Sequence, residues 1–119
     1  MTARGSIKVL IVDDSAMVRR VLTLGLSADP GIEVVGAVSN AEAAWALMQH
    51  ERPDVVTLDI EMPGMDGLTF LKTYLAKIPI PTVMISSLTR EGAQITLRAM
   101  EAGAVDVIAK PTVGLADGL

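Results

Sequence analysis

Five short apolar runs, separated by segments of helical length, constrain the fold of this 119-residue chain more than any other feature. The runs are rich in β-branched residues and lack the polar alternation of a half-exposed strand, which is typical of buried strands in a parallel sheet. The segments between them carry apolar residues at helical spacing and end in Gly or Pro. The alternation predicts an α/β domain with a parallel sheet covered on both faces. The predicted strands are residues 7–12, 32–38, 55–58, 80–85 and 105–109.

Four of the intervening segments have the capping and spacing signals of helices. In the last of them, Ala93, Leu97 and Met100 are expected to face the core, and Gly103 is well placed as the C′ residue. Trp45 is expected to be a packing residue rather than a ligand platform. The four helices are expected to begin near Asp14 or Ser15, near Asn40, near Asp66, and near Ser87 or Thr89.

Composition and charge exclude several classes of function. The net charge of −4 and the lack of a Lys/Arg run argue against nucleic acid or an anionic membrane as the primary partner. The absence of cysteine excludes disulfides, thiol catalysis and Cys-ligated metal. The one histidine, His50, lies at the polar end of a predicted helix, and no G-x-S-x-G elbow is present, so esterase chemistry is not expected within this chain. Residues 1–5 read as a polar tail rather than a signal peptide, and we expect a cytoplasmic protein.

Polar side chains follow every predicted strand at the point where the strand ends. Right-handed crossovers bring the carboxyl ends of parallel strands to one edge of the sheet, where α/β folds bind their ligands. Each of these residues alone reads as a turn, a cap or a surface residue, and Asp59 alone is more often a turn residue. Their joint occurrence at one edge favours a functional site. They are Asp13, Asp14, Ser39, Asn40, Asp59, Ser86, Ser87 and Lys110.

The residue types in this set favour phosphoryl chemistry that depends on a metal. Neighbouring carboxylates raise one another's pKa unless a cation lies between them, and all-oxygen ligands suit Mg²⁺. A central aspartate can then act as a nucleophile and form an aspartyl phosphate. Charge on the transferred oxygens can be met by the metal, by Lys110 and by the Ser86 hydroxyl.

Taken together, these residues resemble the receiver domain of two-component response regulators over about residues 6–113. The resemblance implies a flavodoxin-like, CheY-like fold with strand order 2-1-3-4-5 and a fifth helix after the last strand. The motifs that carry it are Asp13-Asp14, Asp59 followed by Met62-Pro63-Gly64-Met65-Asp66-Gly67, Ser86, and Lys110-Pro111.

The same resemblance implies a role for each site residue. Asp59 is the implied phosphoacceptor. Mg²⁺ is implied to bind Asp14, Asp59 and the backbone carbonyl of Glu61, with Asp13 acting through a water on the metal. The implied contacts of the phosphoryl oxygens are Ser86 and Lys110.

Residues 57–63, 86–93 and 97–110 resemble more closely the regulatory domain of the chemotaxis protein-glutamate methylesterases, the CheB family. In that family a linker joins the receiver to a Ser-His-Asp esterase that demethylates chemoreceptors. The resemblance implies a CheA-like histidine kinase as phosphodonor and regulation of an attached methylesterase that this chain does not contain. Three alternatives stay open: a stand-alone phosphohydrolase with an Asp nucleophile, suggested by Asp59-Ile60-Glu61, a single-domain receiver of another pathway, and a flavin- or nucleotide-binding module.

The chain departs from the receiver pattern in two places. Val107 stands three residues before Lys110, where many receivers carry an aromatic switch residue, so signalling by a swinging aromatic ring is not expected here. Residues 114–119 form at most the first turn of the fifth helix or a linker, so we expect the domain to be truncated there. A missing fifth helix would leave apolar sheet surface uncovered beside the first helix and favour dimerisation or helix exchange.

Overall fold

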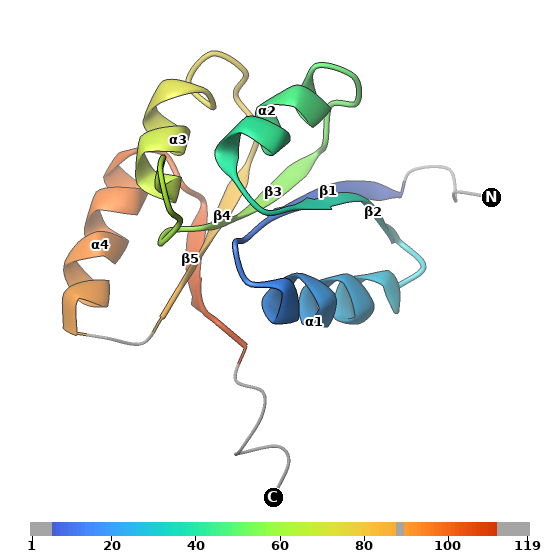
Figure 1. Ribbon diagram of the computed structural model, residues 1–119, viewed down its shortest axis with the longest axis horizontal. Helices are drawn as coiled ribbons and strands as arrows, with labels where there is room; N and C mark the ends of the chain where they lie inside the picture. Colours follow the sequence, from blue (N-terminus) through green and yellow to red (C-terminus); the bar gives the residue numbers. More distant parts are fainter. Residues whose placement is uncertain (1–5, 88–89, 112–119) are drawn as a thin grey trace, which may run out of the picture.

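The computed structural model describes residues 6–87 and 90–111. Five parallel strands form one sheet in the order β2-β1-β3-β4-β5, which confirms the predicted flavodoxin-like, CheY-like topology (Figure 1). The tail at 1–5 and the predicted start of a fifth helix at 114–119 lie outside the described residues. The strands are β1 (Ile7–Val12), β2 (Ile32–Val38), β3 (Val55–Asp59), β4 (Thr82–Ser86) and β5 (Asp106–Ala109). The described helices are α1 (Ala16–Ser27), α2 (Ala41–Met48), α3 (Gly67–Thr73) and α4 (Arg90–Glu101).

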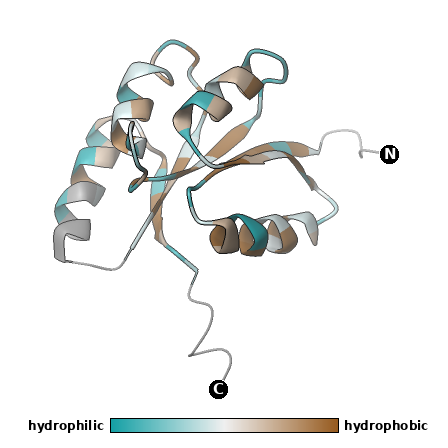
Figure 2. Ribbon diagram, in the orientation of Figure 1, coloured by the Kyte–Doolittle hydropathy of each residue, from teal (hydrophilic) through white to brown (hydrophobic). Residues whose placement is uncertain are grey.

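The helices lie on both faces of the sheet, as predicted. Helix α1 lies on one face, while α2, α3 and α4 pack against the other (Figure 1). Apolar residues are concentrated along the strands between these layers (Figure 2). Side chains alternate between the two faces along a strand: Leu10 and Val12 of β1 belong to the core beneath the three helices, whereas Ile11 is buried outside that cluster. None of the described helices is long and apolar enough to cross a membrane.

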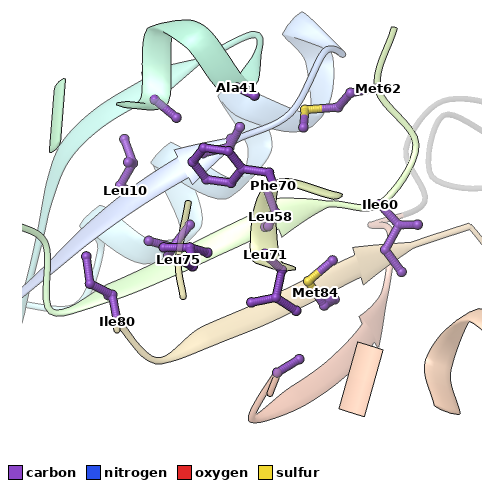
Figure 3. Packing of buried hydrophobic residues seen from close by; sticks show 14 of the residues in the cluster. Leu10, Ala41, Leu58, Ile60, Met62, Phe70, Leu71, Leu75, Ile80 and Met84 are labelled. Carbon is purple, nitrogen blue, oxygen red and sulfur yellow. The ribbon is translucent and has the colours of Figure 1, made fainter. Parts of the chain in front are cut away.

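The main core is built around Phe70 of α3, which is fully buried (Figure 3). Leu58 of β3 belongs to the same cluster. Trp45 of α2 packs at its margin, with its ring centroid 4.8 Å from that of Tyr74, and the Tyr74 ring lies 5.4 Å from that of Phe70. The packing role predicted for Trp45 is therefore confirmed.

Helix ends follow the capping rules on which the sequence prediction relied. The side-chain oxygens of Ser15, Asn40 and Asp66 each accept a hydrogen bond from the backbone N–H three residues further on, at 3.2, 2.8 and 2.8 Å. At the end of α4, Gly103 has a φ of 110°, and its N–H bonds back into the last turn of the helix. That conformation carries little penalty only for glycine, so its C′ role is confirmed.

Four strand boundaries differ from the prediction by one or two residues. Strand β4 begins at Thr82 rather than at residue 80, because Pro81 has no N–H to donate to the ladder. Strand β5 begins at Asp106 rather than at 105. Strands β3 and β4 run one residue further, to Asp59 and Ser86. The ladders pair Asp59 with Ile85 and Ser86 with Ala109, so Asp59 and Ser86 are both held by the sheet rather than by a loop.

The inward face of α4 was predicted wrongly. Leu97 and Met100 are 65% and 45% exposed, whereas Ala99 is fully buried. Since a helix turns by about 100° per residue, the buried stripe that contains Ala99 leaves the two larger residues on the outside. The buried residues of α4 and of the turn that follows it include the small Ala99 and Ala104. The side chain of Ala93, the third predicted core residue, lies outside the described set.

Gly67 begins α3 where the chain passes very close to Asp59. A Cβ at position 67 would lie 2.0 Å from the carbonyl oxygen of Asp59 and 2.9 Å from its carbonyl carbon. Gly67→Ala is therefore expected to lower the free energy of unfolding by about 1–3 kcal/mol, because backbone atoms cannot move aside as a flexible side chain can. Urea denaturation followed by circular dichroism measures the change.

Gly25 of α1 provides the matched control for this substitution. A Cβ there meets nothing within 4 Å, so Gly25→Ala is expected to raise the free energy of unfolding by about 0.5–1 kcal/mol through the better helix propensity of alanine. Equal effects of the two substitutions would contradict the close approach at Gly67.

Candidate functional site

Three aspartates form an acidic cluster at the carboxyl edge of the sheet. Asp13 and Asp14 follow β1, and Asp59 ends the neighbouring strand β3. Carboxylate oxygens of the three lie within 4.8 Å of one another. Asp13 and Asp59 are buried and Asp14 is exposed. We call Asp13, Asp14 and Asp59 the acidic cluster; it is open to solvent through Asp14.

Asp13 is held firmly, yet one of its oxygens has no partner. Its Oδ1 accepts a hydrogen bond from the N–H of Ser15 at 2.8 Å, and its backbone carbonyl accepts one from Arg19 Nη1 at 2.7 Å. Its Oδ2 is buried without a hydrogen-bond partner among the described residues. A buried carboxylate oxygen left in this way is costly, and a bound cation would satisfy it. The prediction from sequence did not include this contact of Arg19. The sequence feature that could have indicated it is the position of Arg19 one helical turn after the capping Ser15.

Asp59 has a partner on each carboxylate oxygen. Its Oδ1 accepts from the N–H of Glu61 at 3.0 Å, and its Oδ2 lies 3.3 Å from Lys110 Nζ. Burial raises the pKa of Asp59 to about 7; a hydrogen bond with Asp14 and the charge of Asp13 add to the rise, while Glu61 N–H and Lys110 oppose it. Near neutral pH and without a cation, Asp59 is therefore partly protonated, and binding of a cation would displace that proton.

Lys110 supplies the positive charge at the site. Its backbone N–H donates to the carbonyl of Ser86 at 2.9 Å, which ties the end of β5 to the end of β4. Burial alone would lower the pKa of Lys110, but the negative charges of Asp59 and Asp13 hold it above its usual value. The ammonium therefore stays protonated at neutral pH and faces the acidic cluster.

Ser86 lies at the site, but its hydroxyl does not contact Asp59. Ser86 is buried, and its Oγ donates to the carbonyl of Ser87 at 3.2 Å. Ser87 in turn donates from its Oγ and from its N–H, the latter at 3.3 Å, to Oε1 of Glu61. The hydrogen bond from the Ser87 hydroxyl lowers the pKa of Glu61. We call this contact the Glu61–Ser87 pair; the sequence pointed only to the backbone carbonyl of Glu61 and gave no signal for a partner of its carboxylate.

Two other positions predicted from the sequence, Ser39 and Asn40, are not part of the acidic cluster. The Asn40 side chain is occupied as the N-cap of α2, where it accepts from Ala43 N–H, and Ser39 is exposed. Val107, at the position of the switch aromatic in many receivers, is partly buried against the main core. The residues that the structure brings together are thus Asp13, Asp14, Asp59 and Lys110, with Glu61, Ser86 and Ser87 at the rim.

The acidic cluster fits Mg²⁺. Its donors are carboxylate oxygens, the hard ligands that Mg²⁺ prefers, and the exposed side leaves room for the waters and the phosphate oxygen that complete an octahedron. The unpartnered oxygen of Asp13 and the raised pKa of Asp59 both indicate that the site is incomplete without a cation. Asp13, Asp14 and Asp59 would hold the ion, with the backbone carbonyl of Glu61, two residues after Asp59, as the further ligand that the sequence resemblance implies.

Fold and site together define a receiver, and the sequence matches that class. The family model of the response regulator receiver domain matches residues 9–115. The chain therefore belongs to the response regulator receiver domain family.

Among receivers, the chain is similar to those of chemotaxis methylesterases. It is 64% identical over 115 residues to protein-glutamate methylesterase/protein-glutamine glutaminase 2 of Cereibacter sphaeroides, an alignment that covers 97% of this chain and 32% of the relative. The crystal structure of the response regulator domain of Thermotoga maritima CheB superposes with a TM-score of 0.83 at 43% identity, covering 93% of this chain and 84% of that one.

A chain in the crystal structure of the P1 domain of CheA3 with CheY6 from R. sphaeroides matches with a TM-score of 0.78 at 34% identity, covering 97% of this chain and 90% of that one. The chain spans about a third of the length of the curated relatives it matches, at 32% and 33% of two of them.

Proposed function

We propose that this chain is the phosphoacceptor domain of a two-component response regulator and that Asp59 carries the phosphoryl group. The observation that supports this most strongly is the position of Asp59, buried in the acidic cluster with Lys110 Nζ 3.3 Å from one oxygen. A buried aspartate between a cation site and an ammonium is placed to attack phosphorus while the charge on the phosphoryl oxygens is neutralised.

Each residue then has a defined part in phosphoryl transfer from a phosphohistidine. An oxygen of Asp59 bonds to phosphorus as the P–N bond breaks, and the imidazole leaves and takes up a proton from solvent. When bound to the acidic cluster, Mg²⁺ supplies positive charge that offsets the carboxylates and the incoming phosphoryl oxygens. Lys110 provides a second fixed positive charge. For Ser86 to bind a phosphoryl oxygen, its hydroxyl must turn away from the carbonyl of Ser87.

The signalling pathway that we propose is supported by the proteins to which this chain is similar. We infer a CheA-like histidine kinase as phosphodonor, supported by the likeness to the chain from the CheA3–CheY6 complex. We further infer that the domain regulates an attached methylesterase acting on chemoreceptors in the cytoplasm, since the curated relatives are methylesterases about three times its length. By itself the domain would catalyse only its own phosphorylation and dephosphorylation. The net charge of −4 supports protein partners rather than nucleic acid or membrane.

The direct test is phosphorylation of the purified chain by acetyl phosphate or a phosphorylated CheA-type P1 domain. With Mg²⁺, intact-mass spectrometry should show one phosphoryl adduct that hydroxylamine removes, since an acyl phosphate is labile to that nucleophile. EDTA should abolish the adduct and added Mg²⁺ should restore it. An adduct that forms equally well in EDTA would contradict the proposal, and sustained turnover of a phosphomonoester would support the phosphohydrolase alternative instead.

A further inference from the structure

The Glu61–Ser87 pair connects two loops across the rim of the acidic cluster. Glu61 lies two residues after Asp59 in the loop that follows β3, and Ser87 is the first residue after β4, 26 positions further along the chain. One carboxylate oxygen accepts both the hydroxyl and the backbone N–H of Ser87. The contact thus fixes the backbone at the start of the second loop to the side chain of the first.

The pair also includes the residue whose carbonyl accepts the hydroxyl of Ser86. Ser86 donates to the carbonyl of Ser87, so the residue that Glu61 holds is also the acceptor that keeps this hydroxyl away from Asp59. Glu61, Ser87 and Ser86 form one chain of hydrogen bonds along the rim. A phosphoryl group on Asp59 would compete for the Ser86 hydroxyl, and so for the far end of that chain.

The charge of Glu61 makes the pair sensitive to the state of Asp59. The Glu61 carboxylate is close enough to Asp14 and Lys110 to be influenced by both charges. A phosphoryl group on Asp59 would add negative charge at the same rim, and like charges at short range repel. The added charge would also draw Lys110 toward the phosphoryl oxygens and away from Glu61.

We propose that the Glu61–Ser87 pair is a latch that holds the start of the loop after β4 in its unphosphorylated arrangement and opens when Asp59 is phosphorylated. The inference rests on the proposed phosphorylation of Asp59 and adds two positioning residues to it. While the latch is closed, binding of a phosphoryl group has to break its hydrogen bonds. A chain without the latch should therefore bind a phosphoryl analogue about three- to tenfold more tightly, the range expected for a partly exposed hydrogen bond to a carboxylate.

The test uses beryllofluoride with Mg²⁺ as a non-covalent phosphoryl analogue and isothermal titration calorimetry as the readout. Ser87→Ala removes the hydroxyl and should lower the dissociation constant about three- to tenfold, whereas Ser87→Thr keeps a hydroxyl and should behave as wild type. Ser39→Ala removes an exposed serine at the same sheet edge and is the matched control. Glu61→Gln also removes a negative charge that repels the anion, so its effect on affinity is not due to the latch alone. The double variant Glu61→Gln with Ser87→Ala separates the two causes: if both residues act through one latch, the change in binding free energy of the double variant is smaller than the sum of the changes in the two single variants.

Hydrogen exchange in the protein without the analogue tests the latch independently of phosphorylation. The backbone N–H at position 87 should exchange several-fold faster in the Glu61→Gln variant than in wild type, because its acceptor is weakened. Faster exchange with tighter analogue binding supports the latch. Unchanged exchange, or faster exchange with unchanged affinity, overturns it. If wild type does not bind beryllofluoride at all, the proposed function fails, and the exchange result still shows whether the pair forms.

Discussion

Asp59→Asn is expected to abolish the Mg²⁺-dependent acyl phosphate, with a fall in labelling rate of at least about 10³-fold, the order seen when a nucleophile is removed. An amide oxygen is a poor nucleophile toward phosphorus and cannot give a stable acyl phosphate. The replacement preserves volume, and its Oδ1 can still accept the N–H of Glu61, so the loss should not arise from unfolding. Intact-mass spectrometry after incubation with acetyl phosphate and Mg²⁺ measures the adduct.

Asp54→Asn is the control for this experiment. Asp54 is exposed before the start of β3, at the opposite end of that strand, and its carboxylate accepts the backbone N–H of Lys8 at 2.8 Å. The same change in charge there should leave labelling intact. Labelling of the Asp59→Asn variant at the wild-type rate would end the assignment of Asp59 as phosphoacceptor.

Asp59→Asn is also expected to raise the free energy of unfolding when Mg²⁺ is absent, by about 2–4 kcal/mol near pH 8. The pKa of Asp59 is raised from 3.8 to about 7 in the folded chain, chiefly by burial. Between these values the folded state binds more protons than the unfolded state, so stability falls as pH rises from about 4 to about 7 and is constant above that. Asparagine does not titrate and avoids the cost of a buried charge.

Urea denaturation of both proteins at several pH values measures this difference. The gap between variant and wild type should be largest near pH 8, smaller near pH 6 and absent below about pH 4. Saturating Mg²⁺ should narrow the gap, since an ion bound by the acidic cluster of the folded wild-type chain would stabilise that chain by mass action. The difference in stability between the Asp54→Asn variant and wild type should not change with Mg²⁺, because both keep the acidic cluster. A wild type more stable than the Asp59→Asn variant at pH 8 without metal would contradict the raised pKa.

The topology could be predicted because it depends on features that are local in the sequence. Each apolar run and each cap is legible in a few residues, and the handedness of crossovers then places the ends of all strands at one edge. Asp13, Asp14, Asp59 and Lys110 directly follow or end strands, so their meeting required no knowledge of side-chain conformation.

The features that escaped prediction depend on packing and on rotamers. Leu97 was expected inside because large apolar residues usually are, but the face of α4 that is buried contains the small Ala99 and leaves Leu97 exposed. Glu61 and Ser87 are 26 residues apart, and nothing in their spacing indicates that one side chain reaches the other. The direction of the Ser86 hydroxyl likewise depends on a neighbouring carbonyl rather than on residue type.

The absent side chain at Gly67 lets one short helix serve two purposes. Gly67 rests against the carbonyl of Asp59 and donates its N–H to Ile60 at 2.9 Å, while Phe70, one turn later, fills the centre of the main core. A small shift in how the core packs around Phe70 would therefore also move the backbone of Asp59, the proposed phosphoacceptor. We therefore expect substitutions deep in the hydrophobic interior, away from the carboxylates, to change how long a phosphoryl group persists on Asp59.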